Sequence, residues 1–341
     1  MSKKLLLIGP RFTIKDPTIT GGTMILFEQL LKDLSTLKIP VVIVDTNSYN
    51  YKNFVHAWFS VMFQFFKNVF SVDHVSIHGT INHYILVAPF VIFFSKIFKK
   101  SVSLRKFAGN FDKVYEKGNF IIKKDIEYIL KNSDINFFET KYLVDYFSQF
   151  NKNTFWFPNV RERLIEPKLD REFKKRFVFM GQIRKEKGMD ELLDASNMLG
   201  DDYTLDVYGY FFEKEYDEEY FKNYKANYKG ALASEDVLSV LQNYDVLILP
   251  SYREGYPGII LEAYSLGIPV IATNLPSLKE IVEDKKTGLL VDVKNSKELY
   301  EAVLYFNKDN YSRFIEGAYK AFEPFDSIRQ TKKFLELIDG H

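Results

Sequence analysis

The sequence predicts an α/β protein made of two domains of similar size in tandem. Short apolar runs alternate with longer stretches of helical periodicity, which is the pattern of βαβ units around a parallel sheet. This alternation breaks once, at 155–172, and then restarts. The chain has 341 residues, which is more than a single hydrophobic core usually supports, so two domains are expected.

In the first half, LLLIG (5–9) and VVIVD (41–45) are typical of parallel strands buried on both faces, because they are apolar without alternation. Between them, residues 21–37 carry leucines at helical spacing and predict a helix. This strand–helix–strand order indicates a layered domain with helices on both faces of a sheet. The strand series continues with VSIH (75–78), VSL (102–104) and INFFE (135–139).

The break at FWFPNVRERLIEPKLDRE (155–172) holds two prolines and mixed charges, and it predicts the linker between the domains. After it, MDELLDASNML (189–199) has the periodicity of a helix. The second domain therefore repeats the α/β plan of the first. Its strands are expected at RFVFMG (176–181), LDVYG (205–209), DVLILP (245–250) and PVIAT (269–273).

Composition and charge exclude several classes of protein. The formal net charge is +1 and no RNA- or DNA-binding motif is present, so the sequence argues against a nucleic-acid-binding protein. The absence of cysteine excludes disulfides and thiolate catalysis, and it fits a reducing compartment. The start, MSKKLLLIGP, is too short in apolar residues for a secretory signal, and no stretch approaches the ~20 apolar residues of a membrane span. We expect a cytoplasmic protein.

Two aromatic segments of the first domain leave two interpretations open. NFVHAWFSVMFQFFKNVF (53–70) is apolar almost all round, and ILVAPFVIFFSKIFKK (85–100) ends in a basic cluster. Packing as buried helices is the more common outcome for such segments. The alternative is a surface that lies on a membrane, with rings in the headgroup layer and lysines outside it. Asp73 is the only acidic residue between Asp45 and Asp112. A solvated basic face is the more common reason for any one basic residue here, and the alternative is contact with anionic lipid or a phosphate-bearing acceptor.

The stretch SYREGYPGIILEAYSLGIPVIAT (251–273) places Glu254 and Glu262 on either side of a turn that opens a helix. The Pro-Gly pair suits a first helical turn, so a helix is predicted over 258–266, with Gly267 as its stop. A helix N-terminus beyond the end of a strand is an anion site, and a nucleotide diphosphate suits it. A carboxylate accepts two hydroxyl hydrogen bonds, which suits the diols of a hexose or a ribose.

This stretch resembles the E-x7-E region of the family 4 retaining glycosyltransferases, which have the GT-B fold of two Rossmann-like domains facing each other across a cleft. The resemblance covers most of the chain. It implies an acceptor-binding domain over 1–160, a nucleotide-sugar-binding domain over 161–321, and a last segment, 322–341, that crosses back onto the first domain. Further similar segments are TGGTMILFEQLLKDL (20–34), VSIHG (75–79), TFWFPNV (154–160), FVFMGQIRKEKGMDELLDA (177–195) and KKTGLLVD (285–292).

Carried over residue by residue, the resemblance implies a donor site in the second domain. Glu262 would hold the ribose hydroxyls and Glu254 would contact the donor sugar. Lys187 would neutralise the diphosphate. Gln182 stands where the family usually has an arginine, and Arg184, or alternatively Lys185, would supply the second cation. The remaining donor-binding groups would be Gly181, Tyr256, Gly258, Ile259 and Ile260.

The resemblance also implies roles outside this loop. Gly21 and Gly22 would let the backbone approach the sugar or the acceptor closely. His78 would lie near the donor sugar, and a packed structural histidine is the alternative for a single histidine at a strand end. The base would be read largely by backbone groups near Tyr228.

A second variation from the family lies in RKFAGNFD (105–112), where many relatives have a histidine-glycine pair. Gly109 keeps the glycine. Arg105 or Lys106 would then face an anionic acceptor.

The implied reaction is transfer of a sugar from a nucleotide diphosphate sugar to a hydroxyl of a saccharide or lipid-linked acceptor, with retention at the anomeric carbon. UDP is the favoured nucleotide and GDP the alternative. Negative charge grows on the diphosphate as the bond to the sugar breaks, so a helix N-terminus and nearby cations supply preorganised stabilisation. By family habit, the product belongs to a bacterial cell-surface polysaccharide made at the inner face of the membrane.

No metal or other cofactor is expected, because there is no Asp-x-Asp motif and the five histidines form no ligand set. Two other functions stay open. One is a sugar-nucleotide epimerase of the same fold. The other is a non-catalytic module that binds a nucleotide sugar, which Gln182 alone favours.

Overall fold

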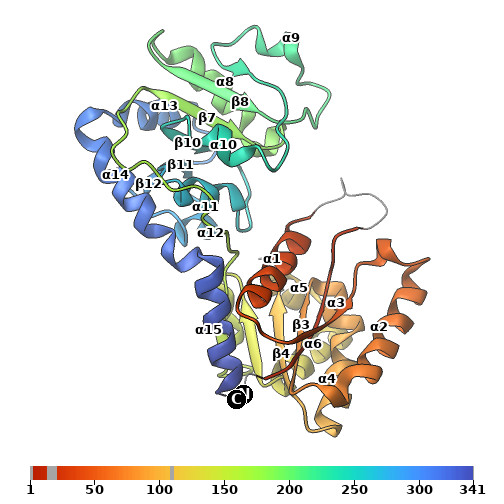
Figure 1. Cartoon of the computed structure of the whole chain (residues 1–341). Helices are drawn as coiled ribbons and strands as arrows, with labels where there is room; N and C mark the ends of the chain where they lie inside the picture. Colours follow the sequence, from red (N-terminus) through yellow and green to blue (C-terminus); the bar gives the residue numbers. More distant parts are fainter. Residues whose placement is uncertain (1–2, 14–20, 108–110, 341) are drawn as a thin grey trace. The chain divides into compact units, whose positions relative to one another are not determined.

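The computed structural model describes residues 3–13, 21–107 and 111–340. The chain divides into two compact units, each built around its own sheet (Figure 1). Unit 1 comprises Met1–Val160 and Ser327–His341, and unit 2 comprises Arg161–Asp326. Each sheet has six strands, and every pairing in it is parallel. The predicted α/β architecture with two Rossmann-like domains is confirmed.

The sheet of unit 1 has the order β2-β1-β3-β4-β5-β6. The apolar runs that predicted strands form the first five of them, with bounds that shift by at most two residues, whereas β6 includes Phe155 and Trp156, which the sequence analysis assigned to the linker. Parallel pairing suits these runs because both faces of such a sheet are covered by helices. The strands are β1 (Leu5–Gly9), β2 (Val41–Asp45), β3 (His74–Gly79), β4 (Ser101–Lys106), β5 (Ile135–Phe138) and β6 (Thr154–Trp156).

Helices cover both faces of this sheet, and β1 shows how the two faces are divided. Leu6 and Ile8 belong to one buried cluster with α2 to α7, whereas Leu5 and Leu7 belong to another with α1 and α15. Alternate side chains of a strand point to opposite faces, so an unbroken apolar run fills both cores. The helices of unit 1 are α1 (Gly22–Thr36), α2 (Phe54–Asn68), α3 (Ile81–Leu86), α4 (Ala88–Ile97), α5 (Phe111–Lys117), α6 (Phe120–Asn132), α7 (Lys141–Phe147) and α15 (Ser327–Asp339).

The sheet of unit 2 has the order β12-β11-β10-β7-β8-β9. The chain therefore moves outward from β7 in one direction and then outward from β10 in the other. The strand order reverses between these two central neighbours. The strands are β7 (Arg176–Met180), β8 (Thr204–Tyr208), β9 (Asn227–Tyr228), β10 (Val246–Leu249), β11 (Val270–Thr273) and β12 (Gly288–Val291).

The core of unit 2 is rich in aromatic side chains. Phe177 and Phe179 of β7 are fully buried among residues of α8, α13 and α14. The helices are α8 (Met189–Met198), α9 (Glu218–Phe221), α10 (Val237–Leu241), α11 (Gly258–Ser265), α12 (Pro276–Lys279), α13 (Ser296–Tyr305) and α14 (Lys308–Ala321).

The last helix, α15, belongs to unit 1, where it packs against α1. Phe334 on this helix is buried against the rings of Phe137 and Phe157, at centroid distances of 5.3 and 5.7 Å. The preceding residues, 322–326, lie in unit 2, so the return to unit 1 begins later than the sequence suggested.

The two aromatic segments are not buried on all sides. Within 53–70, Phe54–Asn68 form the α-helix α2 and a short 3-10 helix begins at Val69, whereas 85–100 is divided between the end of α3 and α4, with Pro89 in the first turn of α4. The interpretation of both as fully buried helices is wrong. Large side chains are exposed on α2 at Phe54, Phe59, Phe63 and Phe66, and on α4 at Phe90, Phe93 and Ile97.

Within the described ranges, no helix has both the length and the apolar character needed to cross a bilayer.

Candidate active site

The predicted donor-site residues of unit 2 lie on two loops at the carboxyl edge of its sheet. One loop follows β7 and leads into α8, and the other follows β10 and leads into α11. Because β7 and β10 are neighbours at the point where the strand order reverses, these loops start side by side. Ligands of open α/β sheets bind outside the carboxyl ends of strands at such a reversal.

A glycine brings the two loops into contact. Gly188 has φ +72°, and a Cβ at this position would lie 2.0 Å from the carbonyl oxygen of Pro250. A side chain here would therefore meet both a strained backbone and a steric clash. The contact is reinforced by the backbone N–H of Tyr252, which donates to the carbonyl of Glu186 at 2.9 Å.

Hydroxyl groups from the end of β11 and from α12 fix the loop after β10. Thr273 Oγ1 donates to the carbonyl of Ser251 at 2.6 Å, and Ser277 Oγ donates to the carbonyl of Glu254 at 2.8 Å. These bonds hold the loop backbone in place before any ligand binds.

Lys187 and Glu254 form an ion pair between the two loops. Lys187 Nζ donates to Glu254 Oε1 at 2.6 Å, and Ser251 Oγ donates to the same oxygen at 2.7 Å. The carboxylate side chain is only 9% exposed, whereas the lysine side chain is 26% exposed. Glu254 Oε2 accepts no hydrogen bond from the part of the chain that the structure describes.

Arg184 lies on the same loop as Lys187 and is engaged locally. Its Nη2 pairs with the carboxylate of Glu186, and its guanidinium lies 5.2 Å from the ring centroid of Phe212. Arg184 Nε is buried and has no acceptor among the described residues. Its use as a second cation for the diphosphate stays a prediction.

Helix α11 begins at Gly258, as the sequence predicted, and no side chain caps its N-terminus. Ile259 and Ile260 occupy its first turn. Glu262 follows one turn inside and accepts a 2.6 Å hydrogen bond from Nε of Arg161. Tyr256, just before the helix, is a buried ring, 6.0 Å from that of Phe325.

A cavity of about 190 Å³ lies at this edge of the sheet. Gly181 of the first loop and Ile259 after the second loop both line the cavity. Its walls are mostly apolar, which suits a flat ring such as a nucleobase. Tyr228 is not among its walls, although the Tyr228 hydroxyl donates to the carbonyl of the wall residue Gly209 at 3.1 Å. The cavity is lined by Met180, Gly181, Gln182, Tyr208, Gly209, Tyr210, Leu232, Val237 and Ile259.

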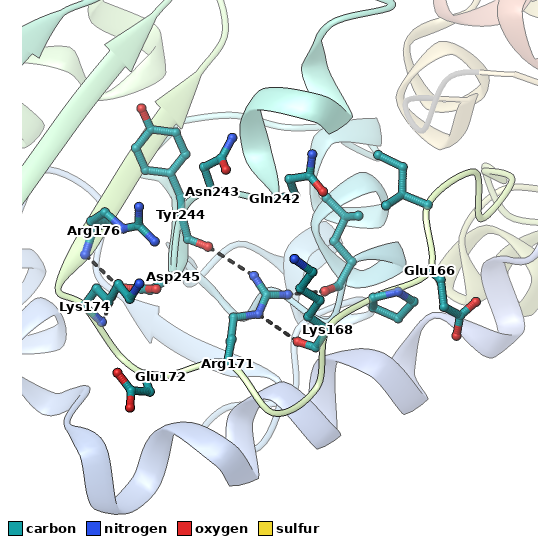
Figure 2. Close-up of a pocket in the computed structure, with 13 residues that line it drawn as sticks. Glu166, Lys168, Arg171, Glu172, Lys174, Arg176, Gln242, Asn243, Tyr244 and Asp245 are labelled. Carbon is teal, nitrogen blue, oxygen red and sulfur yellow. Dashed lines mark hydrogen bonds between the residues drawn. The ribbon is translucent and has the colours of Figure 1, made fainter.

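A larger cavity, of about 450 Å³, lies where the linker passes the amino ends of β7 and β10 (Figure 2). It contains none of the predicted site residues. Arg171 donates to the carbonyl of Tyr244 at 3.3 Å, and the carboxylate of Asp245 accepts from the backbone N–H groups of Lys174 and Arg176 at 2.8 and 2.9 Å. These bonds attach the linker to the sheet, and the cavity is the space left between them.

In unit 1, His78 does not reach the surface. It is 0% exposed, its Nε2 lies 2.9 Å from Ser76 Oγ, and its ring packs 5.3 Å from Phe27 and 6.0 Å from Phe334. Burial lowers the pKa of His78 well below its usual value. A fully buried imidazole cannot touch a ligand, so the structural interpretation is the one that fits.

Arg105 and Lys106 are 1% and 2% exposed, so the prediction that they face an acceptor is wrong. The guanidinium of Arg105 lies 3.6 Å from the ring centroid of Phe157, and burial lowers its pKa to about 9. Gly109 lies outside the described residues.

Gly21 and Gly22 stand at the start of α1, where no side chain caps the helix. A Cβ added at Gly22 would meet no atom of the described chain within 4 Å. The close approach of a ligand at this position stays a prediction.

No group of three acidic or histidine side chains within 3–13, 21–107 and 111–340 is arranged to hold a metal ion.

Comparison with known proteins places unit 2 in a family. Residues 160–321 match the family model described as glycosyl transferases group 1. The N,N'-diacetylbacillosaminyl-diphospho-undecaprenol alpha-1,3-N-acetylgalactosaminyltransferase of Campylobacter jejuni is 26% identical over 155 residues, which are 45% of this chain and 41% of that protein. The capsular polysaccharide biosynthesis glycosyltransferase CapM of Staphylococcus aureus is 28% identical over 131 residues, 37% of this chain and 34% of that protein. The chain thus spans less than half the length of these curated relatives.

Among solved structures, HepE of Anabaena in complex with UDP is similar over 99% of this chain and 100% of that chain, with a TM-score of 0.74 and 15% identity. Sucrose-phosphate synthase of Thermosynechococcus elongatus is similar over 99% of this chain and 98% of that chain, with a TM-score of 0.71 and 14% identity. At these identities the similarity is one of fold, and the fold is GT-B.

Proposed function

We propose that this chain, whose residues 160–321 belong to the glycosyl transferases group 1 and whose two units have the GT-B fold, transfers a sugar from a nucleotide diphosphate sugar to an acceptor hydroxyl. The family match confirms the resemblance that the sequence motifs predicted. One observation carries the proposal. The Lys187–Glu254 pair and the uncapped N-terminus of α11 share the carboxyl edge of unit 2, where the strand order reverses.

Each part of this arrangement has a role in the proposed reaction. Lys187 and the first N–H groups of α11 meet the charge that grows on the diphosphate as its bond to the sugar breaks. Glu254 Oε2, which has no hydrogen-bond partner among the described residues, accepts hydroxyl groups of the donor sugar. Glu262 accepts the ribose hydroxyls. The cavity beside Gly181 and Ile259 receives the base.

UDP is the nucleotide that we propose for the donor. HepE, which shares the fold over its whole length, has been solved with UDP and with UDP-glucose. A uracil ring suits the size and the apolar walls of the 190 Å³ cavity. GDP remains the alternative.

The reaction proceeds with retention in this proposal. The acceptor hydroxyl attacks the anomeric carbon from the side that the diphosphate leaves, and a phosphate oxygen takes the proton of that hydroxyl. The charges that the reaction develops are met by Lys187 and the α11 N-terminus, so the proposal requires no metal ion. No side chain of the chain needs to form a covalent bond to the sugar.

For the acceptor we propose a lipid-linked saccharide of a cell-surface polysaccharide pathway, used by a cytoplasmic enzyme at the membrane surface. Support comes from an aromatic strip formed by α2 and α4, which lie side by side in unit 1 (Figure 1). The Trp58 ring lies 5.4 Å from that of Phe90, and the Phe66 ring lies 4.8 Å from that of Phe94. The exposed members of the strip are Phe59, Phe63, Phe66, Phe90, Phe93 and Ile97.

The charge around the strip suits an anionic lipid surface. Helices α2, α3 and α4 carry no acidic residue, and α2 ends with Lys67 in its last turn. Aromatic rings in the headgroup layer with lysines beside them are typical of helices that lie on a membrane. Next to the strip, an apolar cavity of about 130 Å³ is walled by Phe54, Trp58 and Leu86. It offers a place for an apolar part of the acceptor.

The test is incubation of the purified chain with a panel of UDP- and GDP-sugars, with and without lipid-linked saccharides. Nuclear magnetic resonance of the product gives the anomeric configuration. We expect a glycoside of retained configuration from a UDP-sugar, and loss of both transfer and donor hydrolysis in Glu254→Ala. Isomerised nucleotide sugar without a glycoside would identify an epimerase. Binding without any turnover would identify a non-catalytic module, and an inverted product would contradict the retaining mechanism.

A further inference from the structure

Arg161 is placed against the same face of α11 that carries Glu262. Arg161 Nε donates to Glu262 Oε1 at 2.6 Å, and the two side chains are 23% and 22% exposed. A Cβ added at Gly258 would lie 1.7 Å from Arg161 Nη2, so the guanidinium rests directly on the glycine that opens the helix. Gly258 and Glu262 are four residues apart and therefore share one helix face.

The backbone of Arg161 is fixed as firmly as its side chain. Its N–H donates to the carbonyl of Phe325 at 3.0 Å, and it forms a parallel bridge with Asp326. These contacts join the residue at which the chain enters unit 2 to those at which the chain leaves it. Arg161 is thus held at one end by this crossing and at the other by α11.

A cation at the N-terminal turn of a helix is opposed by the helix dipole. The contact with the Glu262 carboxylate offsets this unfavourable placement. It is a charge-assisted hydrogen bond to a single carboxylate oxygen. Glu262 Oε2 accepts no hydrogen bond from the described residues and is the oxygen left for a ligand. A glutamate held in this way presents a fixed acceptor, whereas a free glutamate must lose several rotamers on binding.

We propose that Arg161 is a positioning residue of the nucleotide site, which holds the Glu262 carboxylate so that Oε2 meets the ribose hydroxyls. This inference rests on the proposed function, in which Glu262 binds the ribose. Arg161 acts through Glu262 and does not touch the reacting atoms. The guanidinium also lies beside Gly258, at the helix N-terminus proposed for the diphosphate, so the test compares nucleotides with and without ribose hydroxyls to isolate the effect that acts through Glu262.

The experiment compares the calorimetric Kd of UDP with that of 2′,3′-dideoxy-UDP, using the full chain. For the unmodified protein we expect UDP to bind about 10-fold or more tightly than the dideoxy compound. In Arg161→Met, UDP binding weakens by about 10-fold more than dideoxy-UDP binding does, so the ratio falls towards one. Arg161→Lys, which restores the charge, recovers part of the ratio.

Arg163→Met is the matched control. Arg163 lies two residues along the same linker and stacks on the ring of Tyr319, 4.1 Å from its centroid, so it leaves the ratio unchanged. A loss of affinity for both nucleotides alike in Arg161→Met would overturn the proposal in favour of a purely structural role. The proposal would also be overturned if Arg161→Met kept the ratio of the two Kd values while Glu262→Gln brought it to one. In that case Glu262 would bind the ribose without help from Arg161. If the unmodified protein bound UDP and 2′,3′-dideoxy-UDP with equal affinity, the ribose hydroxyls would not be recognised at all, and the proposed roles of Glu262 and Arg161 would both be wrong.

Discussion

Lys187 Nζ donates a 2.6 Å hydrogen bond to Glu254 Oε1, across 67 residues of sequence and between the two loops of the candidate site. The charges proposed to act on opposite parts of the donor therefore neutralise one another before the donor binds. A diphosphate offers Lys187 a second anionic partner, and the partly exposed ammonium reaches both. The pair compensates the charge of a nearly buried carboxylate.

Lys187→Ala is expected to lower turnover by about 100- to 1,000-fold, because a preorganised donor at the leaving group is lost. UDP binding falls much less, because the lysine acts mainly on charge that develops in the transition state. Steady-state kinetics and calorimetry separate the two effects. Lys294→Ala serves as the control, because the Lys294 ammonium lies near the same loop, 5.0 Å from the ring centroid of Tyr252, and has no proposed role at the diphosphate. A fall in affinity as large as the fall in kcat would contradict this assignment.

Glu262→Ala is expected to weaken UDP binding by about 10- to 100-fold, since a charge-assisted hydrogen bond contributes about 1.5–3 kcal/mol. Calorimetry measures the change. Glu316→Ala on α14 is the matched control, because Glu316 is also an ion-paired glutamate of a helix in unit 2, with Lys320 as its partner. Equal affinities of the two variants would show that Glu262 does not bind the nucleotide.

Gly188→Ala is expected to destabilise unit 2 by about 2–5 kcal/mol, because a side chain at φ +72° is strained and its Cβ would overlap the carbonyl of Pro250. The two loops then separate and activity falls. Gly255→Ala tests the same substitution on the neighbouring loop, where a Cβ would meet no described atom within 4 Å. Thermal unfolding and turnover are measured for both, and a Gly188→Ala protein as stable as Gly255→Ala would refute the close contact.

Phe63→Ser is expected to reduce sedimentation with vesicles that contain anionic lipid, and to leave thermal unfolding unchanged because Phe63 is 70% exposed. The loss comes from removing one ring from the aromatic strip. Phe120→Ser is the control, because Phe120 is 74% exposed on α6, outside the strip. Equal sedimentation of the two variants would exclude the strip as a membrane surface.

Unit 1 is expected to lose stability as the pH falls below about 6.5. Burial lowers the pKa of His74 to about 3 and that of His78 well below its usual value. The unfolded chain therefore binds protons that the folded unit does not. The contribution of these neutral histidines to the free energy of unfolding is fully present above about pH 6.5. As the pH drops from there towards the pKa of the histidine in the folded protein, each histidine lowers the free energy of unfolding by about 1.4 kcal/mol per pH unit.

Both tryptophans, Trp58 and Trp156, belong to unit 1, so their fluorescence in urea titrations reports this unit alone. His74→Gln is expected to flatten the pH dependence between pH 6 and 5 by about 1 kcal/mol. His56→Gln, which changes an exposed histidine of α2, keeps the slope of the unmodified protein. An unchanged slope in His74→Gln would show that His74 is not buried as a neutral group.

The strands were the part of the fold most readily predicted from sequence. LLLIG and RFVFMG are apolar on both faces, and the helices that cover them follow in the chain, so local pattern and tertiary burial agree. The aromatic helices were harder. Phe59 and Phe65 are the same residue type in the same segment, yet Phe59 is exposed and Phe65 is fully buried. The difference depends on where α4 packs.

The candidate site divides in the same way. The loop from Ser251 and the start of α11 at Gly258 follow from local turn chemistry, and both were predicted. The Arg161–Glu262 contact spans 101 residues, and nothing in the short-range pattern indicates it. His78 ends a strand, as many ligand-binding histidines do, but only the return of α15 with Phe334 shows that its ring is covered.

The return of α15 also makes unit 2 an insertion within unit 1, since residues 161–326 separate the two parts that build one core. During synthesis, unit 2 leaves the ribosome as a continuous piece and has all of its strands before the last helix is made. Unit 1 begins first and finishes last, because Phe334 and Ile338 must arrive to close the side of the sheet that holds Leu5 and Leu7. A stop codon shortly after residue 326 would therefore spare the later half of the chain and leave the earlier half with an open core, prone to aggregation.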